Sequence, residues 1–240
     1  MLQLIDHVFF VLIVVGLALR AWFSMRTLRS LSPERLVEMR PRFWARAIAT
    51  QWLLVLGVGA WWLAQGRPVA WLGLVPRLGW GFGGVMMGVV VMAFALLAQR
   101  RAIATSPDIR ARLRVRFARI AAILPGRREE WPGFASLAIT AGICEELLFR
   151  GFVTWWLAHL LPVFWMAVVA QGVLFGLAHA YQGPRGVLAT GAVGLFMGGV
   201  VWISGSLWAA MILHALIDMH AGDTALTVFE ADAAAASALA

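Results

Sequence analysis

The chain has 240 residues, of which 62% are hydrophobic and only 13% are charged, and its mean hydropathy is +0.82. A soluble domain carries roughly 25% charged residues, so this composition is typical of a membrane protein and excludes an ordinary soluble enzyme. The net charge of +8 arises from 20 basic residues, all arginine, which cluster between apolar segments without interleaved aromatic residues. This distribution is typical of cytoplasmic loops in membrane proteins and does not predict nucleic-acid binding.

Three apolar segments in the first half of the chain are each long enough to cross a bilayer, which takes about 20 residues. They extend over Leu4–Phe23, Phe43–Gln65 and Gly79–Ala98. Between the first two, Ser32 and Pro33 predict the start of a helix, because serine caps free amide groups and proline suits the first helical position.

The most basic part of the chain lies between residues 99 and 131. Within it, the stretch Asp108–Leu124 places apolar residues at helical spacing opposite arginines. This pattern predicts an amphipathic helix, which either lies on an anionic membrane surface or serves as an ordinary solvated connector.

The second half of the chain is almost continuously apolar from Trp131 to about Ala221. Pro162, the sequence YQGPRG at residues 181–186 and the sequence SGS at residues 204–206 divide it into four helices. We therefore predict an all-α, polytopic transmembrane helical bundle of about seven spans with a basic amphipathic connector helix. Its regions are an N-terminal three-helix membrane region (1–131), a four-helix core (132–221) and a flexible, alanine-rich tail (222–240).

The arginine distribution also predicts the topology. The loops around residues 24–42 and 99–131 hold most of the arginines, whereas those around 66–78 and 158–162 hold few. The positive-inside rule then places the N-terminus outside and the C-terminus inside. The arginine- and alanine-rich composition without lysine favours a prokaryote of high genomic GC content, and hence a bacterial inner (cytoplasmic) membrane. The oligomeric state stays open.

Six ionisable residues lie within the last four helices, where contact with lipid makes ionisable groups costly and marks them as functional candidates. They are Glu145, Glu146, Arg150, His179, His214 and Asp218.

The spacing of these residues predicts different roles for the two adjacent glutamates. Glu146 and Arg150 are four residues apart, so on a helix they share one face and should form an ion pair. Glu145 is turned by about 100° from Glu146 and lacks that partner. We therefore expect Glu145 to be the reactive carboxylate and to act as a general base.

The histidines lie on two further helices, and His214 shares a face with Asp218. Imidazole and carboxylate groups on separate helices can either bind a divalent metal or position a water molecule. The zinc-protease sequence H-E-x-x-H is absent. Each histidine by itself is also consistent with a simple hydrogen bond between helices.

Three motifs in order resemble those of a known family. E-E-x-x-x-R at residues 145–150, F-x-x-x-H at 175–179 and H-x-x-x-N/D at 214–218 are similar to the motifs of the CPBP family. This is the CAAX protease and bacteriocin-processing (Abi) group of intramembrane endopeptidases. The resemblance covers about residues 132–220, and the first three helices match only in hydropathy.

The resemblance implies a site within the bilayer in which Glu145 activates a water molecule that attacks a peptide carbonyl and His179 helps to orient that water. His214 and Asp218 would support the developing oxyanion or bind a metal, and Glu146 and Arg150 would hold the site together. The family has been described both as metalloproteases and as glutamate-dependent proteases, so a zinc ion held by Glu145, His179 and His214 stays open. Asp218 departs from the common asparagine. An ionised aspartate would repel an oxyanion unless it is protonated, paired with a histidine or bound to metal.

The sequence thus predicts an intramembrane endopeptidase that hydrolyses a peptide bond of a membrane-associated protein or peptide. The substrate could be a prenylated C-terminus, a peptide leader or a sorting anchor. The sequence does not distinguish among these three substrate classes. Two alternatives stay open. One is a non-catalytic scaffold or regulator that binds peptides through a cavity formed by the same residues. The other is a proton-coupled transporter, although no internal repeat or pair of broken helices supports it.

Overall fold

The computed structural model describes the backbone of residues 1–237 and the side chains of residues 1–229, and within that range the fold is entirely helical. The first helix runs without a break from Leu4 to Arg29 and comprises α1 (Leu4–Val11), the π-helical turn η1 (Leu12–Gly16) and α2 (Leu17–Arg29). It is followed by α3 (Pro33–Ala64), the short 3₁₀ helix η2 (Val69–Leu72), α4 (Trp80–Thr105) and α5 (Pro107–Phe117).

The second half begins with the 3₁₀ turn η3 (Arg128–Glu130). One long helix then contains α6 (Trp131–Glu145), the π-helical segment η4 (Glu146–Val153) and α7 (Thr154–Ala158). It is followed by α8 (Phe164–Ala178), the 3₁₀ turn η5 (Ala180–Gln182), α9 (Pro184–Ser204) and α10 (Leu207–Ser237). The predicted all-α class is confirmed.

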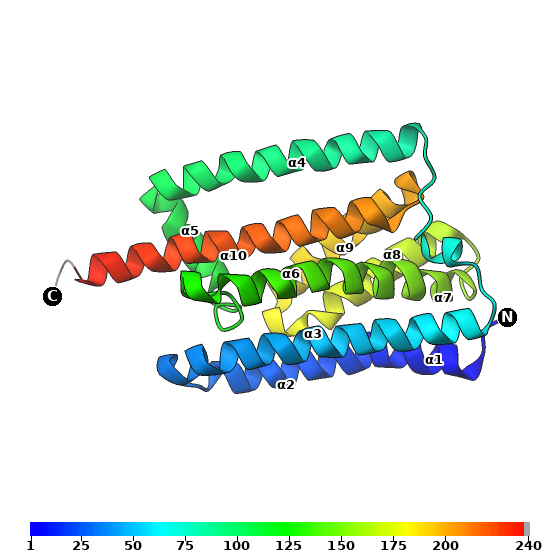
Figure 1. The fold of residues 1–240 in the computed structure, drawn as a ribbon, viewed down its shortest axis with the longest axis horizontal. Helices are drawn as coiled ribbons and strands as arrows, with labels where there is room; N and C mark the ends of the chain where they lie inside the picture. Colours follow the sequence, from blue (N-terminus) through cyan, green and yellow to red (C-terminus); the bar gives the residue numbers. More distant parts are fainter. Residues whose placement is uncertain (238–240) are drawn as a thin grey trace.

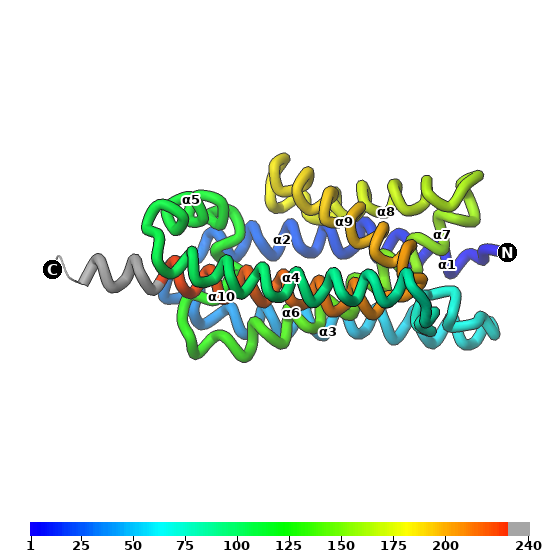
Figure 2. Tube along the Cα trace, turned by 90° about the horizontal axis from the view of Figure 1, so that it is seen from above, coloured from blue at the N-terminus to red at the C-terminus, as the bar shows by residue number. Residues whose placement is uncertain are grey.

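The helices lie roughly side by side, and α6 lies between α3 and α10 (Figure 1). The view from above places α8 and α9 together on one side of the bundle (Figure 2). The N-terminus and the described end of α10 lie at opposite ends (Figure 1). The end that holds the α2–α3 turn and α5 also holds most of the arginines, so we name it the arginine-rich end.

The number of membrane crossings is confirmed only in part. Each of the seven expected segments contains a helix, but five helices within residues 1–237 are long and apolar enough to cross a membrane. The helix α8 has only 15 residues. At 1.5 Å per residue it is about 22 Å long, which is less than the ~30 Å of bilayer hydrocarbon. The expected count of seven spans is therefore not confirmed.

Two expected helix boundaries need correction. The connector helix α5 ends at Phe117 rather than near Leu124, and the residues after Phe117 form turns. Phe117 and Leu124 pack with Trp44 and Phe134 in a buried cluster, so the apolar side of this segment packs against the bundle. At the other boundary, α10 continues to Ser237, beyond Ala221, where we placed the end of the last helix and the start of a tail.

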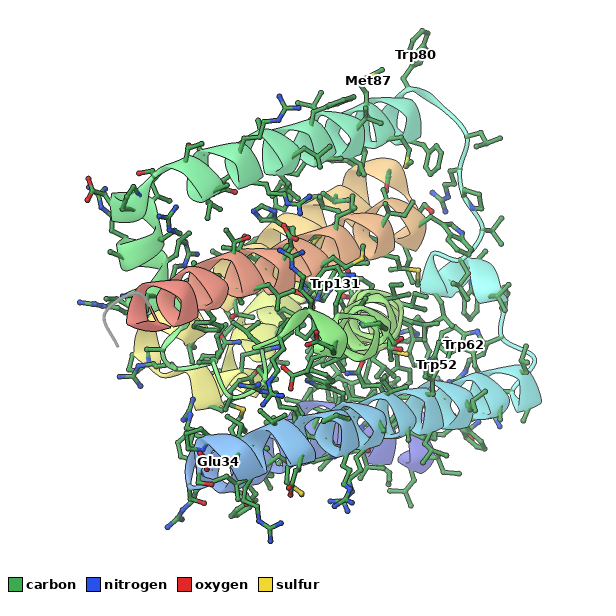
Figure 3. The ribbon with its side chains drawn as sticks, turned by 60° about the vertical axis from the view of Figure 1, so that its left-hand side comes forward. Glu34, Trp52, Trp62, Trp80, Met87 and Trp131 are labelled. Atoms are coloured by element: carbon green, nitrogen blue, oxygen red, sulfur yellow. The ribbon has the colours of Figure 1, made fainter. Side chains whose placement is uncertain are left out.

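Apolar side chains also cover much of the outer surface, as expected for a protein surrounded by lipid. Trp80 and Met87 on α4 are 99% and 64% exposed, and they point away from the other helices (Figure 3). The predicted start of α3 is confirmed, because the Ser32 hydroxyl accepts a hydrogen bond from the Arg35 amide and Pro33 occupies the first turn. The helix then continues past Pro41 into the second expected span.

A buried ion pair fastens the N-terminal helix to the rest of the bundle. Asp6 is 0% exposed and accepts two hydrogen bonds from Arg67, at 2.7 and 2.8 Å, and a third from the Trp61 ring at 3.0 Å. The Arg67 guanidinium lies 4.6 Å from the centre of the Trp155 ring on α7. Asp6 lies in the first turn of α1, near the start of the helix, yet its side chain is closed off from solvent.

A second buried ion pair fastens α3 near the arginine-rich end. Arg40 lies 3.1 Å from Glu130, and the same carboxylate accepts hydrogen bonds from the amides of Gly126 and Arg127. Arg40 also donates to the Ala122 carbonyl at 3.2 Å. These contacts hold the loop that leads into α6, and so they help to fix the helix that carries the two adjacent glutamates.

Candidate active site

The two glutamates lie where the long central helix changes its hydrogen-bonding pattern. Glu145 ends α6, and Glu146 begins the π-helical segment η4. The Thr154 hydroxyl donates to the Phe149 carbonyl, five residues earlier, at 3.0 Å. The sequence predicted a regular α-helix here, and this prediction was wrong. The spacing of apolar residues does not reveal a local change to hydrogen bonds between residues i and i+5. Such π-helical turns occur frequently at functional sites.

The predicted ion pair between Glu146 and Arg150 is confirmed, with Oε1 and Nη1 2.9 Å apart. Both side chains are almost completely buried, at 0% and 1% exposure. The same Glu146 oxygen lies 2.7 Å from Nδ1 of His214 on α10. Because Glu146 is paired with a guanidinium, it acts as an ionised acceptor, and His214 Nδ1–H is the donor. One buried carboxylate therefore joins η4 to α10.

Arg150 also makes contacts with the helices on its other side. Its Nη2 donates to the Gly194 carbonyl on α9 at 3.4 Å, and its guanidinium lies 4.1 Å from the centre of the Phe175 ring on α8. The fully buried Gln171 amide donates to the same Gly194 carbonyl at 3.1 Å. Gln171 belongs to none of the three motifs. A glutamine in an otherwise apolar helix, four residues before Phe175, was the available signal.

Glu145 faces a different helix from Glu146, as the sequence predicted. Its Oε2 lies 4.0 Å from Nε2 of His179, and both side chains are 17% exposed. Nδ1 of His179 lies 2.9 Å from the Phe175 carbonyl. A carbonyl can only accept, so Nδ1 carries the proton and donates it. In the neutral ring, Nε2 then has a free lone pair on the side of Glu145.

Asp218 lies one turn after His214 on α10, and its Oδ2 is 3.7 Å from His214 Nε2. This separation is within ion-pair range but beyond a normal hydrogen bond. The Asp218 side chain is 38% exposed, which makes it the most accessible side chain of the six.

The structure brings all six predicted residues into one region, in two groups. Glu145 and His179 form the first, and Glu146, Arg150, His214 and Asp218 form the second. The Phe175 ring lies between the groups, with its centre 4.7 Å from the His179 ring and 6.2 Å from the His214 ring. Tyr181 adds a further neighbour that we did not predict, since its ring centre is 5.8 Å from that of His179.

Comparison with protein families gives a match that covers this region. Residues 127–220 match the model of the type II CAAX prenyl endopeptidase Rce1-like family. We refer to residues 127–220, which are similar to this family, as the Rce1-like region. The match confirms the resemblance to CAAX proteases that the three motifs indicated. Comparisons with curated proteins and with solved structures give no match.

The Rce1-like region begins just before η3 and extends into α10, so it contains all six residues of the candidate site. The helices before it supply no side chain to the contacts among these six. They contribute instead to the packing around the central helix. Ile13 and Trp62, for example, belong to the same buried cluster as Phe149 of the Rce1-like region.

The residues that could hold a metal in the Rce1-like region are not arranged as a set of ligands. Among the residues that the structure describes, no group of three or more His, Cys, Asp or Glu side chains is placed to hold a metal ion. Nδ1 of His214 contacts Glu146, and Nδ1 of His179 contacts a backbone carbonyl. The set of Glu145, His179 and His214 therefore does not form a ready three-ligand site, and we derive no chemical step through a metal.

Proposed function

We propose that the protein is an intramembrane endopeptidase in which Glu145 activates a water molecule to cleave a peptide bond. The observation that carries this proposal is the facing pair of Glu145 Oε2 and His179 Nε2, 4.0 Å apart on two different helices. At a polar separation beyond about 3.5 Å, a water molecule can bridge the two atoms. Both atoms accept hydrogen bonds, so one water can donate a proton to each of them.

This double acceptor would fix the orientation of the nucleophile. With both protons directed to Glu145 and His179, a lone pair of the water oxygen is left to face the substrate. In the proposed step, the water oxygen forms a bond to the carbonyl carbon and one water proton moves to the Glu145 carboxylate. The carbonyl oxygen takes the negative charge. When the C–N bond breaks, the protonated Glu145 returns its proton to the leaving amine.

The second group of residues would support this chemistry without exchanging protons with the substrate. Glu146 holds His214 through Nδ1, which fixes the direction of the other ring nitrogen, Nε2. Asp218 lies 3.7 Å from that nitrogen. Its pairing with a histidine is one of the conditions under which an aspartate at this position is compatible with an oxyanion nearby. Arg150 neutralises Glu146 and keeps the buried carboxylate charged.

The substrate class follows from where the site lies. The chain is an all-helical integral membrane protein, and Glu145 lies inside a helix that is itself long and apolar enough to span a membrane, Arg128–Ala158. A peptide bond that reaches Glu145 must therefore belong to a protein or peptide that is inserted in or attached to the bilayer. The type II CAAX prenyl endopeptidase family that the region matches supports a protease of this kind.

The first test replaces the proposed base with its uncharged isostere, Glu145→Gln. General-base catalysis contributes roughly 10²- to 10⁴-fold, so we expect cleavage to fall by at least 100-fold. The substrate can be found in the same experiment, by comparing the protein termini in membranes of cells that express the wild type or the variant. Products of the enzyme should be present only with the wild type.

The matched control is Glu129→Gln, which removes an exposed glutamate in the turn before α6. This variant should give the wild-type pattern of termini. Identical patterns for the wild type and for a folded, membrane-inserted Glu145→Gln variant would show that Glu145 has no catalytic role. That result would favour a non-catalytic function for the site.

A further inference from the structure

A hollow of about 270 Å³ lies beside the candidate active site, and neither the motifs nor the proposed hydrolysis uses it. It is lined by Trp22, Arg26 and Arg29 of α2 and by Tyr181 of η5. Its volume is close to the lower end of the roughly 300–1,000 Å³ typical of small-molecule sites. The lining offers two guanidinium groups and a phenol but no carboxylate, so its chemistry favours an anion.

The two arginines lie in the last turn of α2, one helical turn apart, where like charges on one face repel each other. Arg29 is held by backbone acceptors: its Nη2 donates to the Tyr181 carbonyl at 2.8 Å and to the Arg119 carbonyl. Arg26 is different, since none of the described residues provides it with a hydrogen bond or an ion pair. A bound anion would supply the missing partner and remove the repulsion.

Tyr181 adds a donor to the same hollow. Its hydroxyl oxygen accepts a hydrogen bond from the Gln182 amide at 3.3 Å, which leaves the hydroxyl proton free to be donated. Burial raises the pKa of Tyr181 to about 12, so this proton is present at any physiological pH. Arg26 and Tyr181 thus line the same hollow from two different elements, and each has a donor that none of the described residues uses.

The position of the hollow in the bundle indicates the source of the anion. The first helix has 26 residues and is therefore about 39 Å long, whereas the hydrocarbon of a bilayer is ~30 Å thick. From this difference in length we infer that its last turn, which carries Arg26 and Arg29, lies at the level of the lipid headgroups. Trp22 is 49% exposed one turn earlier, as is typical of a tryptophan at the membrane interface.

From these observations we propose that the hollow between α2 and η5 binds the phosphate of an anionic phospholipid headgroup. Arg26 and Tyr181 donate to the phosphate oxygens, and Arg29 contributes its charge while holding η5. The bound lipid would contact the turn that directly follows His179, whose ring lies 5.8 Å from that of Tyr181. This proposal does not depend on the hydrolysis proposed above, because it is tested by binding alone.

The test measures lipid binding by native mass spectrometry of the full-length protein, titrated with phosphatidylglycerol or with zwitterionic phosphatidylcholine. The variant is Arg26→Gln. The control is Arg42→Gln, which removes an exposed arginine from α3 at the same end of the bundle but outside the hollow. Thermal unfolding of each variant shows that it is folded, as expected for exposed positions.

We expect the wild type to bind phosphatidylglycerol at least tenfold more tightly than phosphatidylcholine. Loss of a charge-assisted hydrogen bond should weaken phosphatidylglycerol binding by at least tenfold in Arg26→Gln. Loss of a general surface charge should weaken it by no more than about fivefold in Arg42→Gln. Equal effects of the two variants, or no preference for phosphatidylglycerol, would overturn the proposal.

A further experiment tests whether the hollow binds a lipid headgroup or a soluble anion. Inorganic phosphate is added to the complex of wild-type protein with phosphatidylglycerol at equal concentrations. We expect the lipid to stay bound, because its acyl chains contribute to binding and free phosphate has none. Displacement of the lipid by an equimolar amount of inorganic phosphate would show that the hollow is a site for a soluble anion and would refute the assignment to a headgroup.

Discussion

At the scale of single residues, the adjacent glutamates differ in how completely their charges are paired. Glu146 contacts Arg150 and His214 at 2.9 and 2.7 Å and is 0% exposed, whereas the nearest histidine nitrogen to Glu145 is 4.0 Å away. A carboxylate whose charge is paired with a buried guanidinium is held in place and is a poor proton acceptor. The less constrained Glu145 is therefore the better candidate for the base.

Replacing Arg150, which forms a buried ion pair with Glu146, should destabilise the protein more than replacing Arg35, which forms an exposed one. Removing one partner of a buried ion pair leaves an uncompensated charge and costs about 3–5 kcal/mol. We expect Arg150→Met to lose about this much stability, as measured by unfolding of the purified protein in detergent. Arg35 forms an exposed pair with Glu38, with side chains 72% and 61% exposed, so Arg35→Met should lose no more than about 1 kcal/mol.

Equal losses for the two arginine variants would contradict the view that Glu146 depends on Arg150. Membrane insertion should be measured for both variants, because a failure of Arg150→Met to insert would itself be a severe loss of stability. Arg150→Lys serves as a partial rescue. It keeps the positive charge but loses the planar guanidinium that contacts Phe175, so we expect a stability between those of Arg150→Met and the wild type.

Contacts between residues close together in the sequence could be predicted, whereas contacts between distant residues could not. The pairing of Glu146 with Arg150 follows from helical spacing alone, and the different directions of Glu145 and Glu146 follow from the same geometry. The contact between Glu146 and His214 joins residues 68 positions apart, and it depends on the packing of η4 against α10. Gln171 and Tyr181 belong to no recognised motif, so only the fold reveals their positions.

At the scale of helices, the site depends on a close approach of α6 to α10. A Cβ atom added at Gly142 would lie 2.8 Å from the Ala215 nitrogen, 2.9 Å from the Ala215 Cβ and 2.9 Å from the Met211 carbonyl oxygen. Two of these are backbone atoms, which cannot move without moving α10. Gly142 is three residues before Glu145, and Ala215 directly follows His214. The glycine thus permits the spacing at which the two helices bring the site together.

We therefore predict that Gly142→Ala displaces α10 and weakens both folding and catalysis. Overpacking of this kind typically costs 1–3 kcal/mol, and the substitution should also reduce cleavage because His214 moves relative to Glu146. The control is Gly59→Ala on α3, where an added Cβ meets nothing within 4 Å. That change should be neutral or slightly stabilising, because alanine favours a helix over glycine. Wild-type activity and stability in Gly142→Ala would contradict the prediction.

The sequence predicted the positions of the helices better than their internal geometry. Long apolar segments and turn residues located each of the helices, because lipid requires an apolar surface and backbone groups that are paired within each segment. The change to a π-helix at Glu146 left no such signal. In that segment Gly151 packs closely against Leu72 of η2, which is distant in the sequence. The extension of α10 to Ser237 did have a signal, because its end is rich in alanine, the residue that most favours a helix.

At the scale of the whole molecule, charge is distributed unequally between the two ends of the bundle. Two buried ion pairs, Asp6–Arg67 and Arg40–Glu130, fix the N-terminal helices near opposite ends. Most of the remaining arginines lie on the α2–α3 turn, α5 and the loop before α6, at the arginine-rich end. The opposite positions of the N-terminus and the end of α10 are compatible with an odd number of crossings (Figure 1).

This asymmetry predicts the orientation of the protein in its membrane. Positively charged loops stay in the cytoplasm, so the arginine-rich end should face inward and the turn between η2 and α4 outward. The natural chain has a single cysteine, Cys144, which is buried, so it gives little background in labelling experiments. Cysteines introduced at the exposed positions Ser30 and Leu78 report on the two ends.

In intact cells, a membrane-impermeant maleimide should label Leu78→Cys, and it should label Ser30→Cys only after the membrane is permeabilised. The reverse pattern would contradict the orientation.

The orientation of the protein also determines which leaflet the hollow between α2 and η5 meets, because Arg26 and Tyr181 lie toward the same end as Ser30. With that end facing inward, the hollow meets the cytoplasmic leaflet, where a negative surface potential attracts basic residues. The orientation of the protein in the membrane thus determines whether lipids of the cytoplasmic or of the outer leaflet can reach the turn after His179.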